Sequence, residues 1–136
     1  MVNVLMKQST ILLVDDELEL LRLFKRLVSA KGTLILEAKT GADALKIARE
    51  TRLDLVILDL KLPDMSGTEV LRRIRRTNTG VPVIVVTAHG SAETVRVCME
   101  LGAFDYLTKP FSNQEVRRVA REALASRAGR PIALRE

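Results

Sequence analysis

Five polar side chains of this sequence stand at points where apolar runs end. They are Asp15, Asp16, Asp59, Thr87 and Lys109. Short apolar runs bounded by turn signals are typical of buried strands in a parallel sheet. In such a sheet, ligands bind just beyond the carboxyl ends of the strands. Because these side chains follow different strands, we expect them to converge at one edge of the sheet.

The chemistry of this set is that of phosphoryl transfer. Three carboxylates crowded into a partly dry site repel one another. A cation would neutralise them, and hard oxygen ligands favour magnesium or its relatives. Lys109 adds an ammonium group and Thr87 a hydroxyl, and together with a cation these are what a transferring phosphoryl group requires. A carboxylate can also accept phosphorus covalently, which gives an aspartyl phosphate.

Each residue taken singly has a simpler interpretation. Asp15, Asp16 and Glu17 are acids of the kind that cap a helix or occupy its first turn. Thr87 is a β-branched strand residue, and Lys109 is a surface lysine. Their joint placement after successive strands is what favours a functional site.

Five apolar strand patterns alternate with five helical patterns to position these residues. The strands are predicted at residues 10–15, 34–38, 55–58, 82–87 and 104–107. The predicted helix starts are Asp15 or Asp16, Thr40, Ser66, Ser91, and the capping box Ser112 with Glu115. The alternation predicts an α/β fold in which a parallel sheet is covered on both faces and joined by right-handed crossovers. Two doubly wound strand orders fit this count.

Two helices have predicted ends at glycines. The first helix is expected to stop at Gly32, and the fourth at Gly102. The fourth helix carries Ala92, Val95 and Met99 at helical spacing, so these three residues are its expected apolar positions.

The length and composition of the chain fit one soluble domain with an ordinary hydrophobic core. The chain has 136 residues, of which 47% are hydrophobic and 29% charged. Its single cysteine, Cys98, excludes a disulfide framework and fits a reducing cytosol. No apolar run approaches the ~20 residues of a membrane span, and residues 1–10 lack the pattern of a signal peptide. The expected location is the cytoplasm, with no membrane partner.

The net charge of +5 includes two arginine clusters. They are Arg72, Arg73, Arg75 and Arg76, and then Arg117, Arg118 and Arg121. Both clusters fall within helical patterns, where a solvated polar face accounts for them. Because aromatic residues make up only 3% of the chain, there is almost no stacking surface for bases. We expect no direct nucleic-acid binding by this domain.

Separated motifs of the sequence resemble, in order, those of the receiver domain of two-component response regulators. They are Asp15-Asp16, Asp59 within DLKLPDMSG, Thr87-Ala88, and Lys109-Pro110. The likeness runs over residues 10–125 and leaves residues 1–9 as an N-terminal extension and 126–136 as a tail or the start of a linker. It implies a flavodoxin-like five-stranded sheet of order 2-1-3-4-5.

The resemblance implies a role for each site residue. Asp59 would take a phosphoryl group from the phosphohistidine of a sensor histidine kinase or a phosphotransfer protein. Asp16 and Asp59 would bind Mg²⁺, or Mn²⁺ in its place, directly. Lys61 would contribute its backbone carbonyl to the ion, and Asp15 would act mainly through water. Lys109 would pair with the phosphate, aimed into the site if the Lys109–Pro110 bond has the usual cis form.

The resemblance also implies a switch, not a turnover enzyme. Thr87 and Tyr106 would change position together on phosphorylation and rearrange the surface of the fourth helix, fifth strand and fifth helix, the candidate homodimer surface. Phosphotransfer would be self-catalysed and autodephosphorylation slow. Lys61 and His89 lie two residues after Asp59 and Thr87, where they would influence access of water to the phosphoaspartate.

Two other functional classes fit the sequence less well. A phosphatase of the haloacid-dehalogenase type also uses an aspartyl nucleophile, but it needs a second acid two residues further on, where this chain has Lys61. A Rossmann domain is excluded because no glycine-rich loop follows the first strand. Whether the chain is a stand-alone receiver or the front part of a longer transcriptional regulator stays open.

Overall fold

The computed structural model describes residues 8–88 and 90–128 as a five-stranded sheet with helices on both faces. The strands are β1 (Ser9–Val14), β2 (Thr33–Ala38), β3 (Leu55–Asp59), β4 (Val83–Thr87) and β5 (Asp105–Thr108). The helices are α2 (Leu18–Val28), α3 (Gly41–Glu50), α4 (Gly67–Thr77), α5 (Ala92–Glu100) and α6 (Asn113–Ala128). All strand pairs are parallel, and the order β2-β1-β3-β4-β5 confirms the flavodoxin-like prediction.

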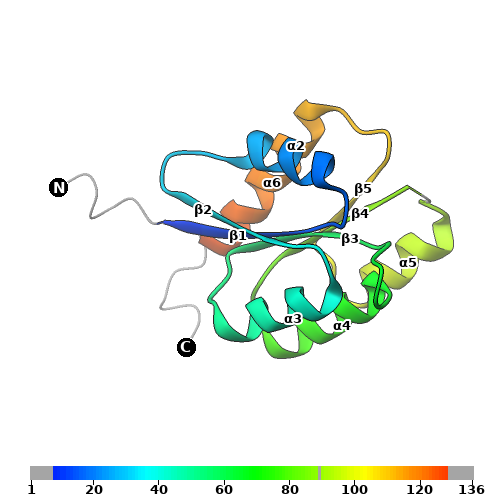
Figure 1. Ribbon diagram of the computed structural model, residues 1–136. Coiled ribbons are helices and arrows are strands. Elements are labelled where there is room, and N and C mark those ends of the chain that lie inside the picture. The colour runs from blue at the N-terminus through cyan, green and yellow to red at the C-terminus, as the bar shows by residue number, and fades with distance from the viewer. Residues whose placement is uncertain (1–7, 89, 129–136) are drawn as a thin grey trace.

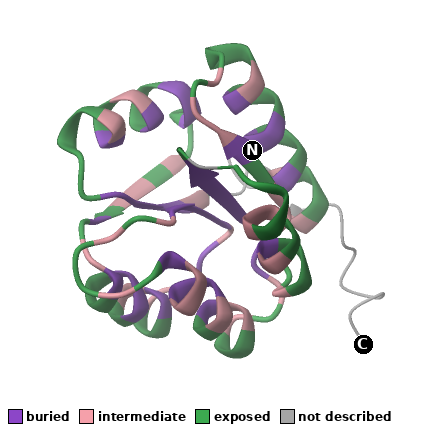
Figure 2. Ribbon diagram, turned by 90° about the vertical axis from the view of Figure 1, so that its right-hand side faces the viewer, coloured by how far each residue is buried: buried purple, intermediate pink, exposed green. Residues whose placement is uncertain are grey.

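The sheet separates two apolar cores. Helices α2 and α6 cover one face, and α3, α4 and α5 cover the other (Figure 1). Because successive residues of a strand point to opposite faces, β3 supplies both cores: Val56 and Leu58 to one, Leu55 and Ile57 to the other. Every residue of β3 is buried, and β3 is the central strand of the sheet. Figure 2 shows buried residues in the sheet and on the sides of the helices that face it. The apolar run before Asp59 thus places that residue at the end of a strand that, like β4, is buried along its whole length.

Four helix starts are capped at the predicted residues. In each, a side-chain hydroxyl accepts a hydrogen bond from the backbone N–H three residues further on, which satisfies a donor that the helix leaves unpaired. The pairs are Thr40 with Asp43, Ser66 with Glu69, Ser91 with Thr94, and Ser112 with Glu115.

The predicted limits of the first helix are wrong at both ends. The N-cap of α2 is Glu17, which makes no side-chain capping bond, and Asp15 instead accepts a hydrogen bond from the Glu17 N–H. The helix ends at Val28, where Ser29 donates its N–H to the Lys25 carbonyl. Gly32, with φ of 82°, lies in the following turn to β2.

The expected inner side of α5 is also wrong. Met99 is 43% exposed and Ala92 is exposed, whereas Cys98 is the buried residue of this helix. Apolar side chains occur on more than one side of α5, so periodicity could not select the side that contacts the core. Within the described residues, no helix combines the length and apolar character that a membrane span requires.

The turn between β3 and α4 is anchored to α3 by Asp64. Its two carboxylate oxygens accept hydrogen bonds from the N–H groups of Gly41 and Ala42, at 2.8 and 2.9 Å. These bonds to the first turn of α3 hold the pKa of Asp64 below its ordinary value. The turn that follows Asp59 is therefore hydrogen-bonded to the start of α3.

A glycine closes the same turn. The Gly67 N–H donates to the Leu60 carbonyl at 2.9 Å, and a Cβ on Gly67 would lie 2.4 Å from the Leu60 Cα. A Cβ on Gly41 would instead meet the flexible Met65 side chain, at 2.5 Å from its Cγ. Both glycines begin a helix, but only Gly67 faces backbone that has no room to shift.

These two glycines give a matched prediction. We expect Gly67→Ala to lower the free energy of unfolding by about 1–3 kcal/mol, because the added methyl group forces backbone apart. Gly41→Ala should cost less, since Met65 can change rotamer. Urea denaturation of both variants measures the difference, and an equal or larger loss for Gly41→Ala would contradict the backbone argument.

Candidate functional site

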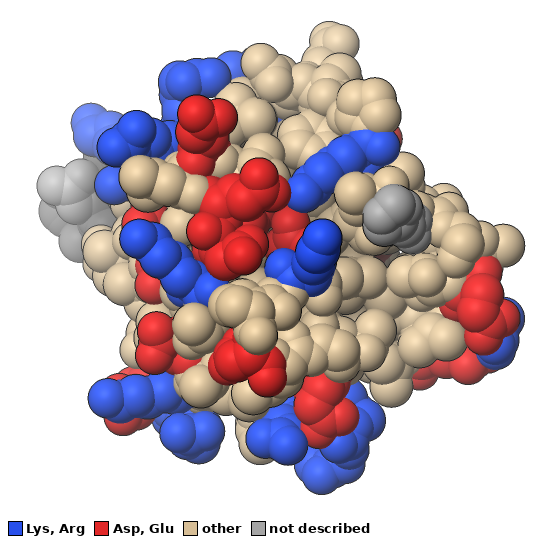
Figure 3. All heavy atoms as spheres, turned by 45° about the vertical axis from the view of Figure 1, so that its right-hand side comes forward, with Lys and Arg blue, Asp and Glu red and all other residues tan. Residues whose placement is uncertain are grey.

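The polar residues singled out from the sequence meet at the carboxyl edge of the sheet. They surround a cleft of about 600 Å³ that is lined by Asp16, Glu17, Asp59, Leu60, Lys61, Thr87, Ala88, Thr94 and Lys109. Acidic side chains gather in the middle of the molecular face seen in Figure 3, with lysine and arginine side chains around them. The strands β1, β3 and β4 and the segment after β5 each bring residues to this edge.

Asp59 is held in place by two donors. The carboxylate is 5% exposed and lies at the last position of β3. Its Oδ1 accepts a hydrogen bond from the Lys61 backbone N–H at 2.8 Å, and its Oδ2 accepts one from Lys109 Nζ at 3.0 Å. A buried carboxylate fixed in this way has a defined orientation toward the cleft.

Asp15 is more enclosed than Asp59 and only half satisfied. It is 2% exposed, and its Oδ1 accepts a hydrogen bond from the Glu17 N–H at 2.9 Å. Its Oδ2 is buried and has no hydrogen-bond partner among the described residues. Burial, helped by the negative charge of Asp59, raises the pKa of Asp15 to about 7 against the lowering effect of the Glu17 N–H. A buried oxygen left without a donor is what a bound cation would satisfy.

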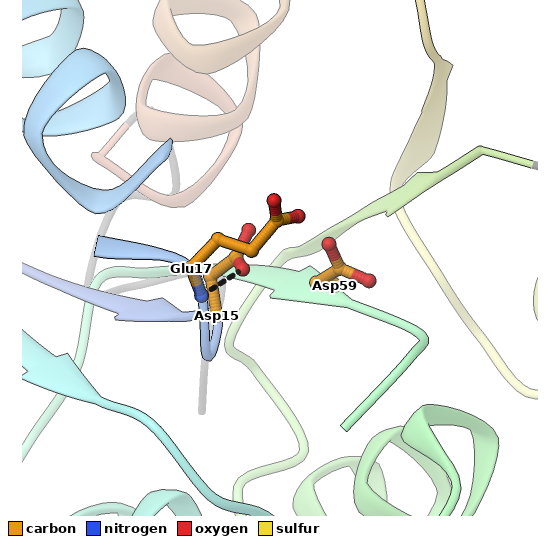
Figure 4. A group of neighbouring side chains, drawn as sticks. All are labelled: Asp15, Glu17 and Asp59. Carbon is orange, nitrogen blue, oxygen red and sulfur yellow. Dashed lines mark hydrogen bonds between the residues drawn. The ribbon is translucent and has the colours of Figure 1, made fainter. Parts of the chain in front are cut away.

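Glu17 completes a group of three carboxylates that sequence reasoning did not identify. One oxygen from each of Asp15, Glu17 and Asp59 lies within 4.8 Å of the other two, and Figure 4 shows the three side chains converging. Asp16, the predicted direct ligand, lines the same cleft but is not a member of this close group. The one sequence feature that could have identified Glu17 was its position next to Asp15 and Asp16. That position was interpreted only as an acid at the start of a helix. An all-oxygen set of this kind suits magnesium.

Lys109 supplies the opposite charge. Its Nζ lies 3.0 Å from Asp59 Oδ2 and 3.7 Å from Glu17 Oε1. Burial by itself lowers the pKa of Lys109, but the hydrogen bond and charge of Asp59, with Asp15 and Glu17 beyond, outweigh it and raise the pKa above its ordinary value. The ammonium therefore stays charged. The Lys109–Pro110 bond is cis.

The structure brings Thr87 to the site but not Tyr106. Thr87 is buried at the end of β4 and lines the cleft. Tyr106 lies on the neighbouring strand opposite Val85, is 39% exposed, and lines a different pocket beside α6. Lys61 lines the cleft and donates its N–H to Asp59, whereas His89 lies outside the described residues.

Comparison with known families matches residues 11–121 to the response regulator receiver domain. The chain belongs to this family. Receiver domains are phosphoacceptor signalling domains that take phosphoryl groups from histidine kinases. They bind Mg²⁺ through acidic residues, and in this receiver the matching feature is the cluster of Asp15, Glu17 and Asp59.

Curated relatives of this receiver include regulators and a phosphotransferase. It is 42% identical over 107 residues to the probable transcriptional regulatory protein TcrX of Mycobacterium tuberculosis, covering 79% of this chain and 46% of that protein. It is 34% identical over 119 residues to sporulation initiation phosphotransferase F of Bacillus subtilis, covering 88% of this chain and 96% of that protein. The receiver thus spans less than half of TcrX but nearly all of the phosphotransferase, and neither relative supports the phosphatase alternative.

Solved structures agree with the fold. A CheY-like receiver domain protein from Methanospirillum hungatei superposes with a TM-score of 0.85 at 28% identity, over 90% of this chain and 98% of that one. The receiver domain of DrrB, in a structure described as activated by BeF3, gives a TM-score of 0.80 at 32% identity, over 88% of this chain and 98% of that one.

The titration of Asp15 predicts a pH dependence of stability in metal-free buffer. In the unfolded chain Asp15 loses its proton near its ordinary pKa of 3.8, and in the folded receiver it does so near 7. Between these values the folded state binds the extra proton, so the contribution of Asp15 to the free energy of unfolding falls as the pH rises from about 4 to about 7.

We expect Asp15→Asn to abolish the fall in the free energy of unfolding between about pH 4 and pH 7, since the amide does not titrate. Urea denaturation of the wild type and the variant across this pH interval measures it. Asp43→Asn, which removes an exposed acid of α3, is the control and should keep the wild-type slope. Parallel stability curves for the wild type and Asp15→Asn would contradict the assigned burial of this carboxylate.

Proposed function

We propose that Asp59 is the phosphoacceptor of this receiver and that phosphorylation there switches a distant surface. The observation that carries the proposal is the environment of Asp59: a buried carboxylate, held by Lys109 and the Lys61 N–H, next to a carboxylate with an unpartnered oxygen. This arrangement presents one oriented nucleophile in a cleft that is wide enough for a phosphoryl group.

The chemical step exchanges one phosphorus bond for another. A carboxylate oxygen of Asp59 attacks the phosphorus of a phosphohistidine on the sensor kinase. The P–N bond breaks, its electron pair returns to the imidazole, and an acyl phosphate forms on Asp59. Lys109, already within 3.0 Å of the carboxylate, pairs with the phosphoryl oxygens as they arrive. The receiver itself supplies these groups, so phosphotransfer would be self-catalysed. Slow loss of the phosphate by hydrolysis is a separate part of the proposal.

The residues that would hold the divalent ion are those of the acidic cleft. Asp15, Asp16, Asp59 and the Lys61 carbonyl are the proposed ligands, and Glu17 is added to them because its carboxylate approaches Asp15 and Asp59. Bound Mg²⁺, or Mn²⁺ in its place, would neutralise the repulsion between these acids and the phosphoryl oxygens. The unpartnered Oδ2 of Asp15 supports this assignment.

Thr87 and Tyr106 form the proposed route to the surface. Moving a two-state equilibrium from mostly inactive to mostly active takes about 5 kcal/mol. A single charge-assisted contact of Lys109 supplies about 1.5–3 kcal/mol, which is not enough. Bound Mg²⁺ and a hydrogen bond from the Thr87 hydroxyl to the phosphoryl group would therefore have to act together with Lys109. Tyr106, exposed on the strand beside Thr87, then turns inward and rearranges the surface formed by α5, β5 and α6, the proposed homodimer interface.

The wider context follows the relatives. The proposed phosphoryl donors are sensor histidine kinases or phosphotransfer proteins. The proposed output is control of transcription, as in the regulator TcrX. A stand-alone signalling role is the second candidate, because the phosphotransferase relative is about as long as this receiver. The receiver is assigned to residues 10–125, preceded by an extension and followed by a tail or linker. Three further points remain predictions. The protein is expected in the cytoplasm, and this domain is expected to make no direct contact with nucleic acid. Lys61 and His89 are expected to influence the lifetime of the phosphate.

Loss of the acceptor tests the first part of the proposal. Incubation with acetyl phosphate and Mg²⁺ should add the mass of one phosphoryl group to the wild type and to Asp43→Asn, as seen by intact mass spectrometry. Asp59→Asn should gain nothing, because the amide is not a nucleophile. A phosphorylated Asp59→Asn protein, or an unmodified wild type, would refute the assignment.

The switch has a built-in reporter. Tyr106 is the single tyrosine of the chain and there is no tryptophan, so intrinsic fluorescence reports on this ring. Phosphorylation should change that fluorescence in the wild type and in Thr79→Ala, an exposed-loop control. Thr87→Ala should accept phosphate but show most of this change lost. A full fluorescence change in phosphorylated Thr87→Ala would argue against coupling through the hydroxyl.

A further inference from the structure

Four of the six residues that line a second cleft of this receiver are arginines. It lies between α3 and α4, which run side by side on one face of the sheet (Figure 1), and has a volume of about 310 Å³. Its lining consists of Leu45, Arg49, Arg72, Arg73, Arg76 and Thr77, and includes no carboxylate. We call it the arginine groove. None of its residues lines the acidic cleft.

The charges of the arginine groove are not balanced from within the domain. Glu69 forms ion pairs with both Arg72 and Arg73 and is the single carboxylate for the two. In the described part of the chain, no ion pair involves Arg49 or Arg76. Four guanidinium groups thus face one carboxylate. Like charges gathered in a groove repel one another and raise the local concentration of anions.

Two of the guanidinium groups are already oriented. Arg72 donates to Glu69 through Nε and Nη2, and Arg73 donates through Nε at 2.7 Å. The remaining N–H groups of both side chains are not used by these bonds. Because Glu69 holds the two side chains, a ligand that binds them loses less side-chain entropy on binding. The neighbouring Arg75 differs, since it donates to the Val81 carbonyl and does not line the groove.

The lining restricts the class of ligand. It has no aromatic ring on which a base could stack, and its one apolar residue, Leu45, is buried and offers little surface to an apolar anchor. Recognition must therefore depend on charge and hydrogen bonds. Guanidinium groups bind phosphate oxygens in pairs, and a diphosphate carries enough oxygens and charge to engage several of them within a small volume.

We infer that the arginine groove binds a compact diphosphate group, either free pyrophosphate or the diphosphate of a nucleotide. The site is separate from the acidic cleft, since the two share no lining residue. A simpler account is that Arg49 and Arg76, in the last turns of their helices, only balance the helix dipoles. That account does not explain why Arg72 and Arg73 line the same groove.

The test compares two double variants of equal charge. Arg49→Gln/Arg76→Gln removes the two unpaired arginines of the groove. Arg117→Gln/Arg121→Gln removes two exposed arginines of α6, on the other side of the sheet, and changes the net charge by the same amount. Titration calorimetry of the whole chain with pyrophosphate, and separately with ADP, is carried out without Mg²⁺. Backbone amide shifts locate each ligand.

The groove variant should bind pyrophosphate roughly tenfold more weakly than the wild type, and the α6 variant should bind as the wild type does. Shifts should cluster at residues 45–49 and 72–77. Tighter binding of ADP than of pyrophosphate identifies a nucleotide as the source, and equal binding identifies free diphosphate. Three results would each overturn the inference. They are equally weakened pyrophosphate binding in both double variants, amide shifts confined to the surroundings of Lys109, and no binding by the wild type.

Discussion

The interaction on which this receiver depends is the contact between the buried carboxylate of Asp59 and the ammonium of Lys109. Three acids approach one another at the carboxyl edge of the sheet, and burial, together with the negative charge of Asp59, raises the pKa of Asp15 to about 7. Lys109 lies 3.0 Å from Asp59 and, in the part of the chain that the structure describes, is the one cation that forms ion pairs with this cluster. Its single positive charge is outnumbered by the three acids, and the negative charge that remains is what a bound divalent ion would neutralise.

The same edge is mechanically tied to the rest of the fold. Asp59 bonds the backbone of Lys61, the turn after it bonds the start of α3 through Asp64, and Gly67 closes the turn against Leu60. On the other side, the Lys109 N–H donates to the Thr87 carbonyl, so the segment that carries the ammonium is fixed to the end of β4. If Asp59 is phosphorylated as proposed, the new charge would act on groups that are already held in place by hydrogen bonds.

The domain also separates its charges in space. Acidic groups occupy the carboxyl edge, whereas arginines accumulate between α3 and α4 with a single carboxylate, Glu69, to balance two of them. A purely structural surface would intersperse opposite charges, as α5 does where Arg96 pairs with both Glu93 and Glu100. Arginines also outnumber their partners on α6, but those of α3 and α4 line one cleft, and this is the reason to regard the arginine groove as more than a solvated helix face.

The sequence by itself determined the alternation of strands and helices and the capping of four helices. It also determined which polar residues meet at the sheet edge, namely Asp15, Asp59, Thr87 and Lys109. The spacing of apolar residues, the capping residues and the strand ends are all local properties of the sequence. Resemblance, not periodicity, supplied the strand order. The tertiary structure decided that Glu17 joins Asp15 and Asp59, that Cys98 and not Met99 faces the core, and that one oxygen of Asp15 lacks a donor. These depend on distances between segments far apart in the chain and on what each side chain packs against, and neither is encoded in local pattern.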